Sequence, residues 1–298
     1  MGDLELAEDR GEAGSAGAGS GMLSGAEGAP AACPTCGGAG ASPSTPALVY
    51  AVGKIEPRFS SPTVEREFAQ AAAREETGAM TDRQVLHAVL GKRENRYLVR
   101  HMGWVFSVQG LETYLLLPRD PADWDLLPET IQPAGGVLMN AAIGVRGPIA
   151  PPHMGNGLAI PILAFDQIYS FDRASLIASI PRPESAGPGF AHAAEELLDR
   201  VLQLTDNAGA TDEHRAVNYL AMRYPAIYAR TAEAFARGCA LSAVETRPSP
   251  LSAHHRLVDV VLSYRDRKTD FVEKYLVRVD VSGEFPFLVT KLQPYFDR

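Results

Sequence analysis

Cysteine is scarce in this sequence, with three residues among 298. So few thiols cannot form the dense disulfide framework that holds a small secreted domain together. The sequence also lacks a run of about 18 apolar residues, the length that a membrane-spanning helix needs. The first ten residues, MGDLELAEDR, are acidic and contain neither the basic nor the apolar region of a secretory signal. These absences predict a cytoplasmic protein that does not enter a membrane.

Positive charge is also scarce, because 28 Lys and Arg residues face 36 Asp and Glu residues, for a net charge of −8. A surface for duplex nucleic acid would have to overcome that field, so nucleic acid is not an expected partner. The sequence has no GxGxxG after a strand, no GxxxxGK[ST], no HExxH and no GxSxG. Nucleotide-binding, zinc-protease and serine-hydrolase chemistry are therefore not indicated, and a non-catalytic role is favoured.

Residues 1–46 are rich in Gly, Ala, Ser and Pro and have no hydrophobic period, which predicts a flexible tail. This tail contains Cys33 and Cys36 in the run CPTCGG, which has the spacing of half a structural zinc site. Zinc needs four ligands, and the sequence has no second CxxC pair. Two chains could share a four-thiolate site across a homodimer, a His or Cys239 could complete it, or the pair could be a free dithiol or a disulfide. Zinc is thus the one cofactor that the sequence suggests, without establishing it.

Residues 47–298 are expected to form one large domain, in which strands are followed by helices and then by strands. This order predicts an α+β fold with an antiparallel or mixed sheet and a helical cluster. The expected early elements are a strand over 48–55, helices over 62–76 and 82–90, and a hairpin around Gln109-Gly110. Three helices between 190 and 238, two hairpin strands and an apolar final segment over 285–296 follow. We expect that final segment to dock on the core.

The stretch from Gly144 to Asp172 is both irregular and apolar, with prolines and glycines between two apolar runs. Such a stretch is typical of a rigid wall that lines a pocket. Its polar members are the candidate binding residues Arg146, His153, Asn156 and Asp166. An unpaired buried carboxylate is costly, so Asp166 is expected either to pair with Arg146 or to bind a ligand.

Two further groups of polar residues are candidates. Glu56 and Arg58 flank a proline between a predicted strand and a predicted helix, where they could bind an anionic group or pair with each other. The run Asp212-Glu213-His214-Arg215, preceded by Asp206-Asn207, could hold a proton relay or a metal. The simpler interpretation of that run is a capped and solvated first helical turn.

Several long runs together resemble a known family, over residues 48–298. They are VYAVGKIEPRF, GLETYLLLPRDPADWDLL, GVRGPIAPP, FDQIYSFD, DNAGATDEHRAVNYLAMRYPAIY and EKYLVRVDVSGEFPFLVTKLQPYFDR. The sequence resembles the C-terminal domain of unknown function of cyanobactin maturation proteins. In patellamide-like pathways that domain forms the C-terminal end of the PatG-type macrocyclase and of the PatA-type protease. No protease or macrocyclase precedes it here, so we expect a free-standing copy.

The resemblance implies a setting in the biosynthesis of ribosomally made, post-translationally modified peptides, and it implies no catalytic residue. The leading hypothesis is a non-catalytic accessory protein that binds the precursor or an intermediate peptide, alongside the enzymes of the same pathway. One alternative is a peptide isomerase or cyclase that uses Asp166, Asp212, Glu213 or His214 as general acid or base. Another is a dimerisation module in which zinc bound at Cys33 and Cys36 joins two chains.

Overall fold

The computed structural model describes residues 46–75, 78–133, 138–182, 189–251 and 254–296. All of them belong to one compact unit, which begins at Thr45. It contains two sheets and a set of helices, so the expected α+β fold is confirmed. Cys33 and Cys36 lie outside the described residues, and the zinc prediction is therefore untested.

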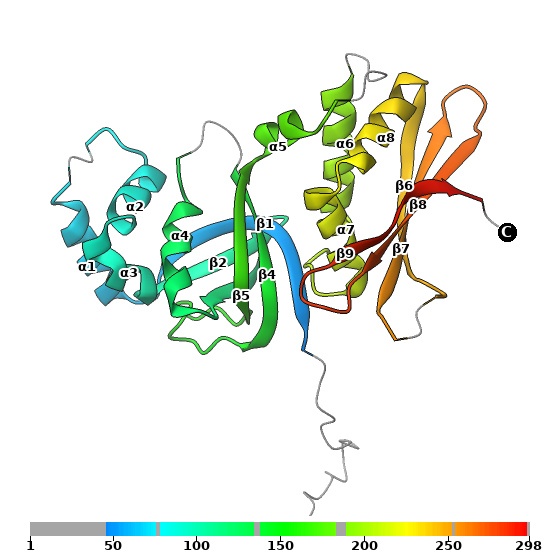
Figure 1. The fold of residues 1–298 in the computed structure, drawn as a ribbon. Coiled ribbons are helices and arrows are strands. Elements are labelled where there is room, and N and C mark those ends of the chain that lie inside the picture. Colours follow the sequence, from blue (N-terminus) through cyan, green and yellow to red (C-terminus); the bar gives the residue numbers. More distant parts are fainter. Residues whose placement is uncertain (1–45, 76–77, 134–137, 183–188, 252–253, 297–298) are drawn as a thin grey trace, which may run out of the picture. The chain divides into compact units, whose positions relative to one another are not determined.

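Five strands form a closed barrel in the order β1, β2, β3, β5, β4 (Figure 1). They are β1 (Leu48–Phe59), β2 (Met102–Val108), β3 (Leu111–Pro118), β4 (Leu138–Ile149) and β5 (Pro161–Asp172). Neighbouring strands are antiparallel except for β3 and β5, which are parallel. Pro161 is the first residue of β5, a position where its missing N–H removes little from the ladder.

Helices close the end of the barrel where β1 ends and β2 begins. They are α1 (Pro62–Ala72), α2 (Asp82–Leu90), α3 (Arg96–His101) and α4 (Leu126–Glu129), with 3₁₀ turns over Arg93–Asn95 and Pro121–Asp125. The side chains of Ser61 and Thr81 cap the starts of α1 and α2, because they accept from the amides of Val64 and Gln84. Apolar side chains of these helices join the barrel interior in one buried cluster around Trp104.

The rest of the chain forms a helical layer and a second sheet. The helices are α5 (Arg173–Ser179), α6 (Phe190–Leu202), α7 (Asp212–Arg223) and α8 (Ala226–Ala236). The antiparallel sheet runs in sequence order through β6 (Cys239–Pro248), β7 (Leu257–Asp266), β8 (Val272–Asp280) and β9 (Phe287–Tyr295). One buried cluster joins α5–α8 to β6, β7 and β8. Figure 1 shows α6, α7 and α8 between the barrel and this sheet.

One expectation about strands was wrong. β1 continues to Phe59 instead of ending near Ile55, because Pro57 pairs opposite Trp104 on β2 and does not end the strand. The final apolar segment pairs with β8 as an edge strand, and its Leu288 and Leu292 pack against the buried cluster, so it docks on the core as expected. Phe287 and Val289, which alternate with these leucines along β9, are about half exposed, at 53% and 46%. Among the described residues, no helix is long and apolar enough to cross a membrane.

The outer wall of the barrel packs on the helical layer through alternating residues of β1. Val49 and Ala51 point into the barrel, whereas Tyr50 and Val52 point outward and pack near Tyr219 on α7. This alternation makes β1 a wall shared by two cores. It also places the loop between α6 and α7 beside the barrel, where the candidate site lies.

Candidate functional site

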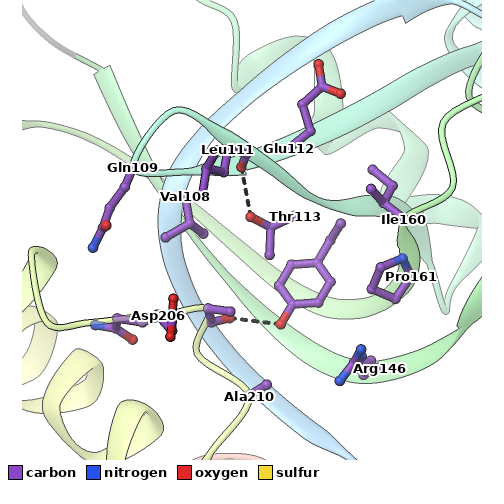
Figure 2. Close-up of a pocket in the computed structure, with 13 residues that line it drawn as sticks. Val108, Gln109, Leu111, Glu112, Thr113, Arg146, Ile160, Pro161, Asp206 and Ala210 are labelled. Carbon is purple, nitrogen blue, oxygen red and sulfur yellow. Dashed lines mark hydrogen bonds between the residues drawn. The ribbon is translucent and has the colours of Figure 1, made fainter.

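A half-open pocket of about 360 Å³ lies at the barrel end opposite α1–α4 (Figure 2). The β2–β3 turn and β3 form one wall, and the segment 206–210 forms another. The start of β5 and the end of β4 form the third. The exposed surface of the lining is mainly apolar. The lining residues are Val108, Gln109, Leu111, Glu112, Thr113, Tyr114, Arg146, Ile160, Pro161, Asp206, Asn207, Ala208 and Ala210. We call this the mouth pocket.

The segment 206–210 fills a gap in the barrel wall beside β1. Residues 48–53 of β1 pair with β4 on one side, but β2 reaches only as far as Lys54 on the other. There the Tyr50 amide donates to the Gly209 carbonyl oxygen at 2.9 Å. The Tyr114 hydroxyl donates to the Ala208 carbonyl oxygen, also at 2.9 Å. The segment is thus held on both edges by the barrel.

A buried pair of asparagines holds the same segment to the helical layer. Asn207 and Asn218 exchange two amide hydrogen bonds of 2.8 and 3.1 Å. Asn218 also donates to the Tyr50 carbonyl oxygen at 2.8 Å, and Asn207 donates to the carbonyl of Val201 at 3.2 Å. These polar groups are satisfied by one another, so they are structural and do not offer a proton relay to a ligand.

The β2–β3 turn is fixed by Gln109, which adopts a left-handed backbone with φ of 52°. Its side-chain amide donates to the carbonyl oxygens of Leu202, the last residue of α6, and of Leu204 just beyond it. Helix ends leave such carbonyls without partners, so this contact stabilises both the turn and the helix. Sequence reasoning predicted the turn from Gln-Gly but did not predict this long-range contact.

Arg146 supplies the positive charge of the mouth pocket. Its side chain forms no ion pair or hydrogen bond with a described residue, although it lies near Tyr114. Burial raises the pKa of the Tyr114 phenol to about 12, and the nearby guanidinium partly opposes that rise. Figure 2 shows Arg146 and Asp206 on opposite sides of the pocket. Asp206 likewise makes no ion pair with any part of the chain that the structure describes.

A second pocket of about 540 Å³ adjoins the first across the β2–β3 turn, and Gln109 and Glu112 line both. It is the more polar of the two, and it contains the predicted residues Glu56 and Arg58 together with Lys54. Arg58 forms an ion pair with Glu112 on β3, so Glu56 is not its partner. We call it the polar pocket. The two pockets are thus neighbours on either side of the β2–β3 turn, one mainly apolar in its exposed lining and one more polar.

The expected pairing of Asp166 with Arg146 was wrong, and strand alternation explains why. Arg146 stands opposite Leu163, whose side chain is buried inside the barrel. Asp166 is three residues further along β5, so its side chain points to the other face of the wall. It pairs instead with Arg119 at 2.7 Å, and the same guanidinium lies 3.3 Å from Glu284.

The structure does not gather the remaining predicted residues at the mouth pocket. His153 is exposed and lines a small pocket beside Trp104, near the opposite end of the barrel. Asn156 is exposed on a tight turn with φ of 52°. Of the six candidate binding residues, Arg146 lies in the mouth pocket and two lie in the polar pocket. Asp206, which sequence reasoning noted but did not choose, belongs to the site.

The charged run at the start of α7 is a capped first turn. The side chain of Thr211 accepts from the His214 amide at 3.1 Å. Asp212 pairs with Arg256 at 3.1 Å and lies 3.5 Å from Arg215. Burial lowers the pKa of His214. No group of three or more metal-ligating side chains occurs within the described ranges.

Comparison with known proteins gives a family for the part of the chain that holds α6–α8 and β6–β9. Residues 185–295 match the family described as PatG C-terminal. This region of the chain is similar to the PatG C-terminal family, and the match covers less than half of the chain. The family recognised from the sequence is therefore confirmed. The comparison with curated proteins finds no match.

A solved structure described as "PatG Domain of Unknown Function" has a similar fold beyond that region. It is 18% identical, with a TM-score of 0.65, over 83% of this chain and 98% of the other. At that identity the similarity concerns the fold alone. The PatG C-terminal region contributes the segment 206–210 to the mouth pocket, while Arg146 comes from the barrel that precedes it.

The pKa of Glu284 predicts how stability depends on pH. Burial, together with the adjacent carboxyl group of Asp166, raises this pKa from 4.5 to about 7, although Arg119 opposes the rise. The folded state therefore keeps a proton that the unfolded chain releases above about pH 4.5. The contribution of this bound proton to the free energy of unfolding is fully present below that pH and is lost as the pH rises towards 7.

We expect the free energy of unfolding to fall by about 1–2 kcal/mol between pH 5 and 7 relative to Glu284→Gln, after allowance for partial exposure. Urea unfolding at several pH values measures the difference. Glu245→Gln, at an exposed position on β6, is the control and should follow the wild type. Parallel pH profiles for wild type and Glu284→Gln would contradict the raised pKa.

Proposed function

We propose that this chain is a non-catalytic accessory protein that binds a precursor peptide, or an intermediate made from it, in cyanobactin-like peptide maturation. The observation that carries the proposal is the pair of neighbouring pockets, the mouth pocket and the polar pocket, which share Gln109 and Glu112. An extended peptide has a polar backbone and side chains of mixed character. Neighbouring apolar and polar pockets suit such a ligand.

The chemistry of the mouth pocket favours binding over catalysis. Its phenol and hydroxyl groups are engaged internally, because Tyr114 donates to Ala208 and Thr113 donates to the Leu111 carbonyl oxygen. The two remaining charges, Arg146 and Asp206, lie on opposite sides of the pocket and do not form a nucleophile–base pair. The family match supports the setting in peptide maturation, since the family is that of the PatG C-terminal domain.

A titration with a cyanobactin-type precursor peptide tests the proposal. We expect isothermal calorimetry to show micromolar or tighter binding to the whole chain. Leu111, which lies at the pocket rim and is 73% exposed, can be changed to Glu without burying a charge. Because Leu111→Glu places a carboxylate on the apolar wall, we expect a loss of affinity of about tenfold. Leu251→Glu, at a 66% exposed leucine outside both pockets, should bind as the wild type does.

The carboxyl pair of Asp166 and Glu284 favours an enzymatic role, such as a peptide isomerase or cyclase, as the second candidate function. A carboxyl group with a pKa near 7 is suited to general acid–base catalysis. Mass spectrometry and chiral amino-acid analysis of the incubated peptide distinguish the two. Unchanged peptide supports the binding role. A new product that is lost in Asp166→Asn, or absence of heat with every precursor fragment, would contradict it.

A further inference from the structure

We infer that the mouth pocket takes the C-terminal residue of a peptide, with its α-carboxylate on Arg146. This inference rests on the proposed peptide-binding role and adds the end of the chain that is recognised. An Arg guanidinium offers paired N–H donors that match the two oxygens of a carboxylate. Arg146 is suited to that contact because its side chain has no ion pair or hydrogen bond within the described part of the chain.

The other polar groups of the pocket limit what else the ligand can carry. Glu112 is neutralised by Arg58, and the Gln109 amide group is bonded to carbonyls at the end of α6. The hydroxyls of Thr113 and Tyr114 donate internally. A sugar or another polyhydroxylated ligand would therefore find few free partners. The charged groups left to a ligand are the guanidinium of Arg146 and the carboxylate of Asp206.

A peptide C-terminus complements both charges. Its carboxylate is the anion for Arg146, and a nearby backbone N–H is a donor for Asp206 on the other side of the pocket. An isolated anion such as phosphate would meet Arg146 but would also face the uncompensated Asp206. The pair of opposite charges thus favours a ligand that carries an anion and a donor on one short backbone.

The size and walls of the pocket indicate what accompanies the carboxylate. A volume of about 360 Å³ is at the small end of ligand pockets, which are roughly 300–1,000 Å³. The apolar walls suit a medium-sized aliphatic or aromatic side chain. They are formed by Val108, Leu111, Ile160, Pro161, Ala208 and Ala210. The preceding residues of the peptide would continue into the polar pocket, past Gln109 and Glu112.

Two short probes test the inference without knowledge of the natural peptide. They are N-acetyl-Gly-Leu with a free carboxylate and N-acetyl-Gly-Leu-amide, which differ only at the C-terminus. A third probe, N-acetyl-Glu-Leu-amide, carries its carboxylate on a side chain. Binding to the whole chain is measured by nuclear magnetic resonance titration, with the Nε–Hε signal of Arg146 as the local reporter.

We expect the free acid to bind at least about tenfold more tightly than either amide, because hydrogen bonds to charged groups are the stronger ones. Arg146→Gln should remove this preference, and Arg146→Lys should restore part of it. Arg265→Gln, at an exposed arginine on β7, is the matched control and should keep the preference. Thermal unfolding of each variant confirms that the fold is retained.

The outcomes separate this inference from the proposed function. Equal binding of the free acid and its amide, with precursor binding intact, would overturn C-terminal recognition and leave the proposed function standing. Tighter binding of the side-chain carboxylate would replace the C-terminus by an internal acidic residue. A preference for the free acid that survives in Arg146→Gln would place the carboxylate elsewhere. Failure of the precursor as well as the probes would overturn both proposals.

Discussion

Arg215→Met is expected to lower the free energy of unfolding by about 3 kcal/mol or more. The Arg215 side chain is 1% exposed, and its guanidinium donates to the carbonyl oxygens of Val281, at 2.7 Å, and of Gly283 and Glu284. These carbonyls belong to the turn between β8 and β9. One buried side chain therefore holds the backbone of that turn. Its removal leaves several acceptors without partners.

The measurement is thermal unfolding followed by circular dichroism. For a domain of this size, a loss of 3 kcal/mol corresponds to a melting temperature lowered by about 6–12 °C. Arg100→Met is the control, because Arg100 is an exposed residue of α3. We expect its melting temperature to stay within about 2 °C of the wild type. Equal melting temperatures for the two variants would show that water satisfies the turn without Arg215.

Gly209→Ala is expected to be the second strongly destabilising change, at about 3 kcal/mol. Gly209 has φ of +72°, and a Cβ at this position would lie 2.3 Å from the Tyr50 carbonyl oxygen and 2.6 Å from Cα of Ala51. Both contacts are with backbone, which cannot rotate away. The change therefore combines the cost of a left-handed residue with a steric clash, each about 1–2 kcal/mol. We also expect it to displace the segment 206–210 and to weaken peptide binding at the mouth pocket.

Gly238→Ala separates the two contributions. Gly238 has a similar φ of +85°, but nothing lies within 4 Å of a Cβ placed there. It should therefore lose only about 1 kcal/mol, the cost of the backbone conformation alone. Urea unfolding of both variants gives the difference. Equal losses would mean that the segment 206–210 is not fixed against β1.

Local features of the fold could be predicted from the sequence because local chemistry determines them. The caps at Thr81, Asp172 and Thr211 are examples, since Thr and Asp favour the N-cap position and each side chain accepts from an amide of the first helical turn. The turn at Gln109 was likewise predicted, from a residue pair that accepts left-handed backbone.

The closure of the barrel and the composition of the mouth pocket could not be predicted in this way. The pairing of Asp166 with Arg119 in place of Arg146 depends on strand alternation and on the bulges between β4 and β5. The pocket joins Tyr114, Arg146 and Asp206, which come from three distant parts of the chain. Arg146 could be proposed as a binding residue from the irregular, apolar stretch that contains it. Asp206 could be placed in the same pocket only from the fold.

The asparagine pair beside β1 has a consequence for how the chain folds. Asn218 bonds to the carbonyl of Tyr50 across 168 residues, and the segment that it anchors supplies the wall that β2 leaves open. The wall beside β1 is therefore completed by a segment that lies between α6 and α7, far along the chain. Such non-local contacts raise the contact order, so we expect slow folding. The barrel and the PatG C-terminal region belong to one compact unit, although the family match covers only the second.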